Sequence, residues 1–367
     1  MTTRLVLKKT TSTTINYSNT NKFNRPINRF CTSVKKVKRQ NKPMQEQPII
    51  SAIDRQLIKA ELTQERFLRT TNKAGNEIYI INAHNSPNTM REIGRLREIA
   101  FRAAGGGTGC EVDIDQFDTM DSPCEQLIVW NPDAEEIIGG YRFILGENIK
   151  YNTDGQPNIA TSHLFHFSQK FIDRYMPYTL ELGRSFVSPE YQSSQAGAKS
   201  LYALDNLWDG LGALTIKYPQ IKYFFGKFTM YPSFNTKGRD MILFYLKRHF
   251  GDRQKLVTPH KPLKFAHKLS LLQRLFPMQA VKENYKILNR EVRALGENIP
   301  PLVNAYMNLS ATMKVFGTAI NDEFGDVEET GILITIKDIY QEKRERHIVS
   351  YVQNIKENLN LKQIGIK

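Results

Sequence analysis

Two opposite charges stand inside an apolar stretch, and their spacing suggests a reactive cleft. Glu181 and Arg184 lie in the run "TLELGRSFVSPEYQ", which is otherwise typical of a strand that leads into a loop. Side chains alternate faces along a strand, so residues three apart would point to opposite faces. Gly183 lies between them, and a glycine inside a strand often marks a β-bulge, which resets the alternation. With a bulge at Gly183, both charges could face one cleft and pair with each other.

A bulge also changes what the backbone can do. It releases N–H groups, here those around Gly183 and Ser185, from the strand ladder, and such groups can polarise a substrate carbonyl. A carboxylate in the same cleft can act as a general base. Glu181 and Arg184 are therefore candidate catalytic residues for a reaction at a carbonyl carbon. The spacing alone also fits an edge strand that carries two solvated charges.

The elements around this strand alternate between helices and strands. Apolar periodicity predicts helices at 52–69, 86–104, 164–176, 197–218 and 237–250. It predicts strands at 76–83, 180–188, 222–230 and 329–340, and a hairpin over 124–145 that turns at Asn131-Pro132-Asp133. This order indicates an α/β (α+β) fold with a central mixed, twisted sheet and helices on both faces.

The net charge of +14 is concentrated in the N-terminal tail. Residues 1–43 hold eleven Lys or Arg and no Asp or Glu, so the remaining 40 basic and 37 acidic residues leave only +3. A nucleic-acid partner is therefore not expected, since the basic surplus belongs to the tail. Apolar runs such as 241–246 and 331–336 are far shorter than the roughly 18 residues that a membrane span needs.

Residues 1–43 are predicted to be a disordered tail, because they are rich in Thr, Asn and Lys with little periodicity. The composition changes at Met44, and our hypothesis is that the working protein begins there. The tail lacks the apolar segment of a secretory signal, although its basic, acid-free start also fits an organelle transit peptide. We expect a cytoplasmic protein.

Six short motifs follow one another in an order that resembles a known enzyme family. They are "LREIAF" with Arg97 and Phe101, "EVDIDQFD" with Asp113, Asp115 and Asp118, "IIGGYRF" with Gly140 and Arg142, "LELGRSFVSPEY" with Glu181, Gly183, Arg184 and Pro189, "LWDGLGAL" and "YFFGKFTMYPSF". In these segments the chain resembles the GCN5-related acyltransferase fold, with 180–188 as its bulged fourth strand. It is more narrowly similar to the branch of the ornithine and glycine lipid N-acyltransferases (haemolysin-like), and more distantly to acyl-homoserine-lactone synthases.

The resemblance implies a division of the chain. Residues 90–250 would form the acyltransferase core, and residues 298–340 would close it. Residues 44–89 would add an N-terminal helix and a first strand, 251–297 a basic helical insertion, and 341–367 a helical tail.

The loop after the bulged strand departs from the acetyltransferase pattern. Acetyltransferases of this fold carry Q/R-x-x-G-x-G/A there, and its backbone N–H groups hold the pyrophosphate of coenzyme A. In "YQSSQAGAKS", Gln192 could open such a donor-binding motif and Gly197 could close it, but Gln195 replaces the first glycine. The departure favours an acyl carrier protein as donor, because its phosphopantetheine carries a single phosphate. A degenerate coenzyme A loop stays an alternative.

The reaction implied by the resemblance is amide formation, in which an amine attacks a thioester and the thiol leaves. Glu181 would be the base, and Arg184 would hold Glu181 or bind the carboxylate of the acceptor. The arginines at 97 and 142 would pair with the acidic cluster, either to order substrate or as a purely structural network. The expected substrate-binding residues are Arg97, Phe101, Asp113, Asp115, Asp118 and Arg142. No metal or bound cofactor is expected; acyl carrier protein or coenzyme A would bring the acyl group as a co-substrate.

A basic and apolar segment at 261–280 is predicted to form one amphipathic helix. Phe265, Leu269, Leu272 and Phe276 would share a face with a rim of Lys and Arg. Such a helix could contact an anionic membrane surface, pack on the core or dock an acidic carrier protein.

The sequence thus predicts an N-acyltransferase that moves a 3-hydroxyacyl chain from acyl carrier protein to the α-amine of ornithine or glycine. The product would be a lyso-aminolipid for membrane lipid synthesis. Two alternatives stay open: an acetyl-coenzyme A-dependent N-acetyltransferase of small amines, and a non-enzymatic membrane-active protein.

Overall fold

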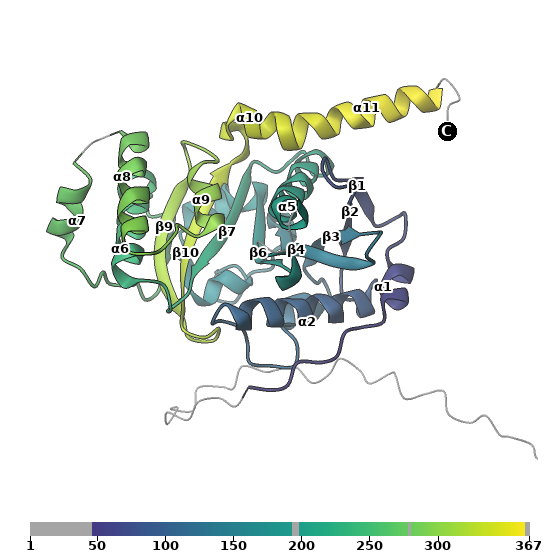
Figure 1. Cartoon of the computed structure of the whole chain (residues 1–367), viewed down its shortest axis with the longest axis horizontal. Helices are drawn as coiled ribbons and strands as arrows, with labels where there is room; N and C mark the ends of the chain where they lie inside the picture. The colour runs from purple at the N-terminus through teal and green to yellow at the C-terminus, as the bar shows by residue number, and fades with distance from the viewer. Residues whose placement is uncertain (1–45, 193–197, 278–279, 364–367) are drawn as a thin grey trace, which may run out of the picture.

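The centre of the molecule is an eight-stranded sheet with the order β1-β2-β3-β4-β6-β7-β10-β9 (Figure 1). The computed structural model describes residues 46–192, 198–277 and 280–363. Neighbouring strands run antiparallel, except for the parallel pair β6 and β7. The strands of this sheet are β1 (Phe67–Thr70), β2 (Glu77–Ile81), β3 (Glu125–Asn131), β4 (Glu136–Leu145), β6 (Thr179–Val187), β7 (Tyr223–Met230), β9 (Lys314–Asn321) and β10 (Val327–Thr335). A separate small sheet pairs β5 (Phe165–Phe167) with β8 (Val257–Pro259).

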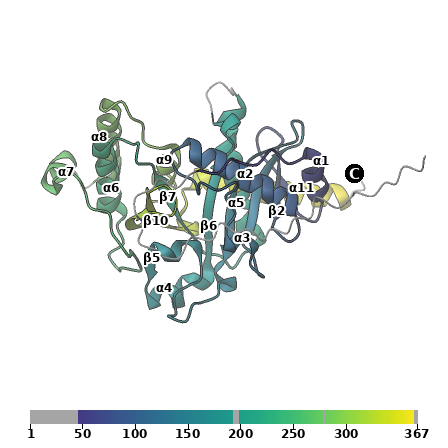
Figure 2. The same cartoon turned by 90° about the horizontal axis from the view of Figure 1, so that it is seen from below.

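Helices cover both faces of the large sheet, which confirms the predicted fold class (Figures 1 and 2). Along β3, Leu127 and Val129 pack on the side of α5, while Ile128 and Trp130 pack on the side of α2. This alternation explains the unbroken apolar run from Leu127 to Trp130, because β3 is buried on both faces there. The helices are α1 (Arg55–Glu61), α2 (Pro87–Ala103), α3 (Gln116–Thr119), α4 (Gln169–Arg174), α5 (Ala198–Lys217), α6 (Thr236–Phe250), α7 (Leu269–Leu275), α8 (Val281–Ala294), α9 (Pro301–Met307), α10 (Gln341–Arg344) and α11 (Ser350–Gln363).

The far half of the sheet is sandwiched in the same way. Phe224 of β7 lies in the core cluster that contains α5, α6 and α8. Its neighbour Phe225 points to the opposite face and packs against Phe171 of α4, with ring centres 5.6 Å apart. The two faces of this half therefore have separate cores, one built on α6 and one built on α4 and β5.

Two segments predicted as helices are partly strands. The helix expected over 52–69 ends at Glu61, and β1 begins at Phe67. The segment expected as a helix over 164–176 contains β5 before α4 begins. In both cases the strand pairs with a segment elsewhere in the chain, β2 or β8, and a periodicity read within one segment cannot report such a partner. Strand β9, which pairs with β10, is absent from our prediction for the same reason.

The prediction of one amphipathic helix over 261–280 is wrong, because α7 has only seven residues. Of the four apolar residues expected on its face, Leu272 and Phe276 are buried in the core, Phe265 packs against that core, and Leu269 is exposed. Most of this apolar face therefore stabilises the fold. Among the described residues, no helix is both long and apolar enough to cross a membrane. The predictions for residues 1–43 and Met44 concern residues outside the described part of the chain.

Candidate active site

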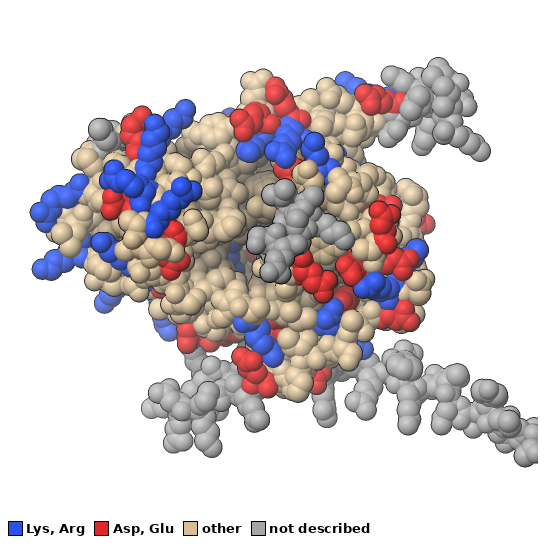
Figure 3. Space-filling view, viewed as in Figure 1, with Lys and Arg blue, Asp and Glu red and all other residues tan. Residues whose placement is uncertain are grey.

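Strands β6 and β7 separate halfway along their length, and a cleft opens between them. Their ladder ends at the pair Leu182 and Gly226, although β6 continues to Val187 and β7 to Met230. The cleft between the diverging ends has a volume of about 240 Å³. The space-filling view has a hollow at this place in the middle of the molecule (Figure 3). Backbone groups that lose their ladder partner here are available to a substrate.

A β-bulge in β6 borders this cleft. In the pairing with β4, Arg184 and Ser185 together lie opposite the single residue Tyr141. Arg184 has a φ of 47°, a left-handed conformation that is unfavourable for a residue other than glycine. The predicted bulge is present, but the residue in the special conformation is Arg184 and not Gly183. Gly183, Arg184 and Ser185 all line the cleft.

Arg184 is directed at the loop between α2 and β3. Its Nε donates to Asp113 at 3.0 Å and its Nη2 to Asp115 at 3.4 Å, while its guanidinium carbon lies 4.7 Å from the ring centre of Phe324. The expected pairing of Arg184 with Glu181 is therefore wrong, because two aspartates of this loop lie within reach of the guanidinium.

The other two arginines of the motifs hold the same loop. Arg97 of α2 and Arg142 of β4 contact Asp118 from two sides, with Nη1–Oδ2 distances of 3.4 and 3.2 Å. Arg142 also donates to Asp115 at 2.6 Å. Asp115 and Asp118 in turn form the capping box of α3. The predicted pairing of these arginines with the acidic cluster is confirmed, and it holds the loop to α2 and β4.

Burial and charge act in opposite directions in this network. Burial raises the pKa of Asp113, although Arg184 and Arg97 oppose the shift. Burial also opposes the ionisation of Asp115, but Arg142 and Arg184 outweigh it and hold the pKa of Asp115 below its usual range. The neighbouring aspartates likewise outweigh burial at Arg142 and raise its pKa well above the usual value. Asp115 therefore stays ionised at any physiological pH.

Glu181 is buried beneath these residues, with 2% of its surface exposed. Thr161 donates to its carboxylate at 3.5 Å. Burial raises the pKa of Glu181, while Arg142 and Lys227 oppose the shift. Glu181 is not among the described residues that line the cleft. Its role as the base therefore stays a prediction.

Lys227 and Glu329 form an ion pair in the wall of the cleft that sequence reasoning missed. The Lys227 ammonium contacts Oε2 of Glu329, and their side chains are 11% and 1% exposed. Burial lowers the pKa of Lys227, and Glu329 opposes this shift. Lys227 is a lone charge in the apolar strand "YFFGKFTM", whereas Glu329 is one of two adjacent glutamates in "EETGILIT". A charge inside an apolar strand also singled out Glu181, so the same signal could have found Lys227.

The cleft passes through the sheet and differs in character at its two ends. The end on the side of α5 and α9 has walls from one core cluster, among them Tyr141, Phe224 and Tyr306. The end on the side of α2 has the Lys227–Glu329 pair and aromatic rings from the other core cluster. Two substrates could therefore approach the bulge from opposite faces of the sheet.

Phe101, expected to bind substrate, belongs to the second end. It lines the cleft and packs edge-on against Phe324, with ring centres 5.3 Å apart. The rings form an uncharged wall beside the charged pair.

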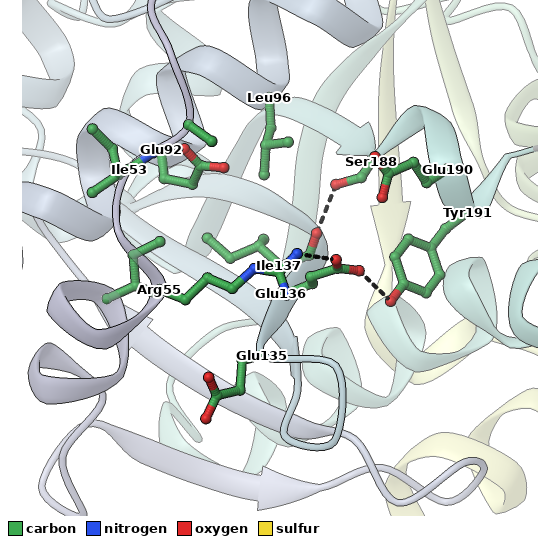
Figure 4. Close-up of a pocket in the computed structure, with 12 residues that line it drawn as sticks. Ile53, Arg55, Glu92, Leu96, Glu135, Glu136, Ile137, Ser188, Glu190 and Tyr191 are labelled. Atoms are coloured by element: carbon green, nitrogen blue, oxygen red, sulfur yellow. Dashed lines mark hydrogen bonds and ion pairs between the residues drawn. The ribbon is translucent and has the colours of Figure 1, made fainter.

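A smaller cavity of about 80 Å³ lies between α1, α2 and the end of β6 (Figure 4). Glu136 accepts from Arg55 at 2.6 Å and from the Tyr191 hydroxyl at 3.2 Å, and Ser188 donates to the carbonyl of Ile137 at 2.7 Å. These groups bind one another across the cavity. These contacts therefore hold the start of the loop after β6 in place, and we assign no substrate to the cavity.

The donor motif expected in that loop begins at Gln192, which is exposed and whose Nε2 donates to the carbonyl of Val187 at 2.5 Å. Gly197 lies outside the described residues. A donor-binding role of this loop therefore stays a prediction.

Known proteins resemble the chain over most of its length. A family model described as an acetyltransferase (GNAT) domain matches residues 96–201, from α2 to the start of α5. The glycine N(alpha)-acyltransferase of Bacteroides thetaiotaomicron is 62% identical over 306 residues, which are 83% of this chain and 91% of that protein. That of Phocaeicola vulgatus is 60% identical over 313 residues, 85% of this chain and 96% of that protein.

A more distant relative is the L-ornithine N(alpha)-acyltransferase of Brucella abortus, which is 25% identical over 224 residues, 59% of this chain and 68% of that protein. No solved structure matches the chain. The suspected branch is thus confirmed by sequence similarity, and the mixed sheet agrees with it. The chain belongs to the GNAT N-acyltransferases, in the family of the glycine N(alpha)-acyltransferases, and it is an acyltransferase.

Proposed function

We propose that this acyltransferase transfers an acyl chain from a thioester to the α-amine of glycine. The observation that carries the proposal is the identity of 60–62%, over more than four fifths of the chain, with two proteins named glycine N(alpha)-acyltransferase. The relative named for ornithine is 25% identical over 59% of the chain. Glycine is therefore the preferred acceptor of the two amino acids predicted from the sequence.

The reaction needs a neutral amine, a polarised carbonyl and a route for the thiol. The amine nitrogen attacks the thioester carbon, the C–N bond forms, and the C–S bond breaks to release the thiol. The negative charge on the carbonyl oxygen is greatest in the tetrahedral intermediate, where N–H donors stabilise it most. We assign this task to the backbone N–H groups of Arg184 and Ser185, since the bulge displaces them from the regular register at the cleft.

The leaving thiolate also needs a proton donor. Tyr141 and Tyr306 line the end of the cleft on the side of α5 and α9, and burial raises the pKa of both hydroxyls. They therefore stay protonated at neutral pH. Either hydroxyl fits this role, with the thioester approaching from their side of the sheet.

We propose acyl carrier protein as the donor of the acyl group. Support comes from a basic surface formed by α7, α8 and the segment before them, which gathers on one side of the molecule (Figure 3). Residues 261–293 hold eight Lys or Arg and two Glu, a net charge of +6. This surface would attract an acidic carrier protein. The basic residues, all exposed, are Lys261, Lys264, Lys268, Arg274, Lys282, Lys286, Arg290 and Arg293.

The product would be a single acyl chain amide-linked to glycine, with a free carboxylate. Such a molecule is amphiphilic, and we propose that it serves membrane lipid synthesis.

A purified assay tests the proposal directly. The full chain is incubated with 3-hydroxyacyl carrier protein and an equal mixture of isotope-labelled glycine and ornithine, and the products are read by mass spectrometry. We expect N-acylglycine as the main product. A parallel reaction with acetyl-coenzyme A and the same amines tests the acetyltransferase alternative. N-acylornithine as the main product, or turnover with acetyl-coenzyme A alone, would contradict the proposed acceptor or donor.

A further inference from the structure

The Lys227–Glu329 pair lies where the acceptor would meet the thioester. Lys227 directly follows Gly226, the last residue of β7 that pairs with β6. Its pairing partner on β10 is Gly331, two residues from Glu329. Both charged side chains therefore stand on one face of the sheet, beside each other across the β7–β10 ladder. This is the face of α2, which the cleft reaches from the bulge.

We propose that Lys227 and Glu329 form the binding site of the acceptor amino acid. An α-amino acid is a zwitterion, and the ion pair presents the complementary charges side by side. The ammonium of Lys227 has three N–H donors, so it can hold Glu329 and an acceptor carboxylate at once. The carboxylate of Glu329 can then accept from the acceptor ammonium. This inference rests on the proposed transfer to an amino acid and names the residues that recognise it.

The surroundings of the pair argue that the fold does not require it. On the face of the sheet that carries the pair, the neighbouring residues of its two strands include the buried Phe225 and Leu333. Burying two charges costs several kcal/mol of desolvation per ion, and apolar residues of similar volume often serve a core equally well or better. A buried pair that lines a cleft is therefore a candidate for binding.

The other cations near the cleft are already engaged. Arg184 binds Asp113 and Asp115, and Arg142 binds Asp115 and Asp118. Lys227 has one carboxylate partner, Glu329, which also faces the cleft. The pair is therefore better suited than the arginine network to exchange contacts with a substrate.

The walls beside the pair fit a small acceptor. Phe101, Tyr231 and Phe324 line the same end of the cleft. A Cβ added at Gly106 would lie 3.1 Å from Tyr231 and 3.4 Å from Phe324, so the loop after α2 packs tightly on these rings. None of these three side chains has a carboxylate to pair with the second amine of ornithine, whereas glycine needs no such partner.

Glu329 would also act as the general base of the reaction. Glu329 takes one proton from the acceptor ammonium, and the neutral amine attacks the thioester carbon. A tyrosine hydroxyl gives its proton to the thiolate, the second nitrogen proton restores that hydroxyl, and the third stays on the amide. The proton on Glu329 then passes to water when the product leaves.

The test uses the full chain, one donor and two acceptors, glycine and glycinamide, which lacks the carboxylate. We expect the wild type to prefer glycine at least about tenfold in kcat/KM, and Lys227→Met to reduce this preference to about twofold or less, with the KM for the donor unchanged. Glu329→Gln should lower kcat by about 10²-fold with either acceptor. The matched control is Glu328→Gln, because Glu328 neighbours Glu329 in β10 but pairs with Arg239 and does not line the cleft. It should keep both the rate and the preference.

A folded Lys227→Met enzyme that still prefers glycine tenfold would overturn the assignment. Should either single variant fail to fold, the double variant Lys227→Met/Glu329→Leu removes both charges together and should fold, as circular dichroism can check. It must then lose the preference for glycine as well. A wild type that acylates neither glycine nor any other amino acid would instead refute the proposed function on which the inference rests.

Discussion

Asp115 forms ion pairs with arginines of two strands, Arg142 of β4 and Arg184 of β6. One carboxylate thus joins the strand that carries the bulge to its neighbour. Since the side chains of Arg142 and Arg184 are only 2% and 14% exposed, they would be costly to leave unpaired. Asp115 therefore contributes both to the stability of the fold and to the placement of the bulge beside the cleft.

Asp115→Asn should lower the free energy of unfolding at pH 7 by about 2 kcal/mol, less than for a fully buried pair because Asp115 is 28% exposed. The pKa of Asp115 is depressed in the fold, so its contribution is complete above the unfolded value of about 3.9 and is lost as the pH falls further. Urea titrations at pH 7 and pH 3.5 should show the gap to wild type narrowing at the lower pH. Asp154→Asn, in an exposed turn, is the control with no such gap. An equal difference in unfolding free energy between wild type and variant at both pH values would contradict the predicted loss of this contribution at low pH.

Two carboxylates, Glu181 and Glu329, are candidates for the base. Only Glu329 is among the described residues that line the cleft, so we expect Glu329→Gln to lower kcat by about 10²-fold. Glu181→Gln should keep the acid limb of the kcat/KM profile and lower the rate at most about tenfold, because Glu181 is not among those residues and affects Arg142 and Lys227 through its charge.

A base at Glu181 would give the opposite result. Burial raises its pKa above 4.5, so the acid limb would lie above pH 4.5 and would vanish in Glu181→Gln. Thr161→Val would then move the limb to still higher pH, since Thr161 favours the ionised form. Those two observations together would restore the assignment made from the sequence.

At the scale of elements, the proposed reaction site depends on the point where β6 and β7 separate. Gly226 ends their ladder, and a Cβ there would stand 2.8 Å from the carbonyl oxygen of Leu182. A side chain would therefore force the strands apart one residue too early. The close approach of the two backbones requires glycine at this position.

Gly226→Ala should lower stability by about 1–3 kcal/mol and reduce turnover, because the wall that carries Lys227 would shift. Gly183→Ala is the matched control for stability on the facing strand, since a Cβ there meets only Arg142 Nε at 3.9 Å. Thermal unfolding and a steady-state assay of both variants give the comparison. Equal effects of the two substitutions would argue against a special constraint at Gly226.

At the scale of the whole molecule, charge is divided between a balanced core and a basic surface. The helices α7 and α8 carry this surface, and α9, which lines the cleft, directly follows them. A carrier protein bound there would stand beside the entrance for its pantetheine arm. The segment 251–297, predicted from the sequence to be an insertion, is thus a candidate for donor recognition.

Lys282→Glu/Lys286→Glu should raise the KM for acyl carrier protein about tenfold or more and leave the KM for acyl-pantetheine unchanged. Added salt should raise the KM of the wild type for acyl carrier protein toward that of the variant, because salt screens the attraction between exposed charges. Lys73→Glu/Lys150→Glu makes the same change of charge at exposed sites in other segments and is the control. If both double variants raise the KM equally, the effect is one of net charge and not of a docking surface.

Much of the fold and part of the site could be predicted from residues close in sequence. The α2 helix, the β3–β4 hairpin, β6, α5 and β7 follow from local periodicity and turn residues. The bulge was indicated by a glycine between two charges, and the partners of Arg97 and Arg142 by an acidic cluster. These signals are local, because hydrophobic periodicity and motif order are properties of short segments.

The tertiary structure alone decided which groups meet. β1 and β9 are strands because β2 and β10 lie beside them, and Arg184 turns to Asp113 because a loop 71 residues earlier in the chain packs on the bulge. Lys227 and Glu329 come together across a ladder between strands that are about 100 residues apart. The sequence by itself determined the family, the inner strands of the sheet and a bulge in β6. The pairing of distant strands decided which charges face the cleft, because such pairing depends on how the whole core packs.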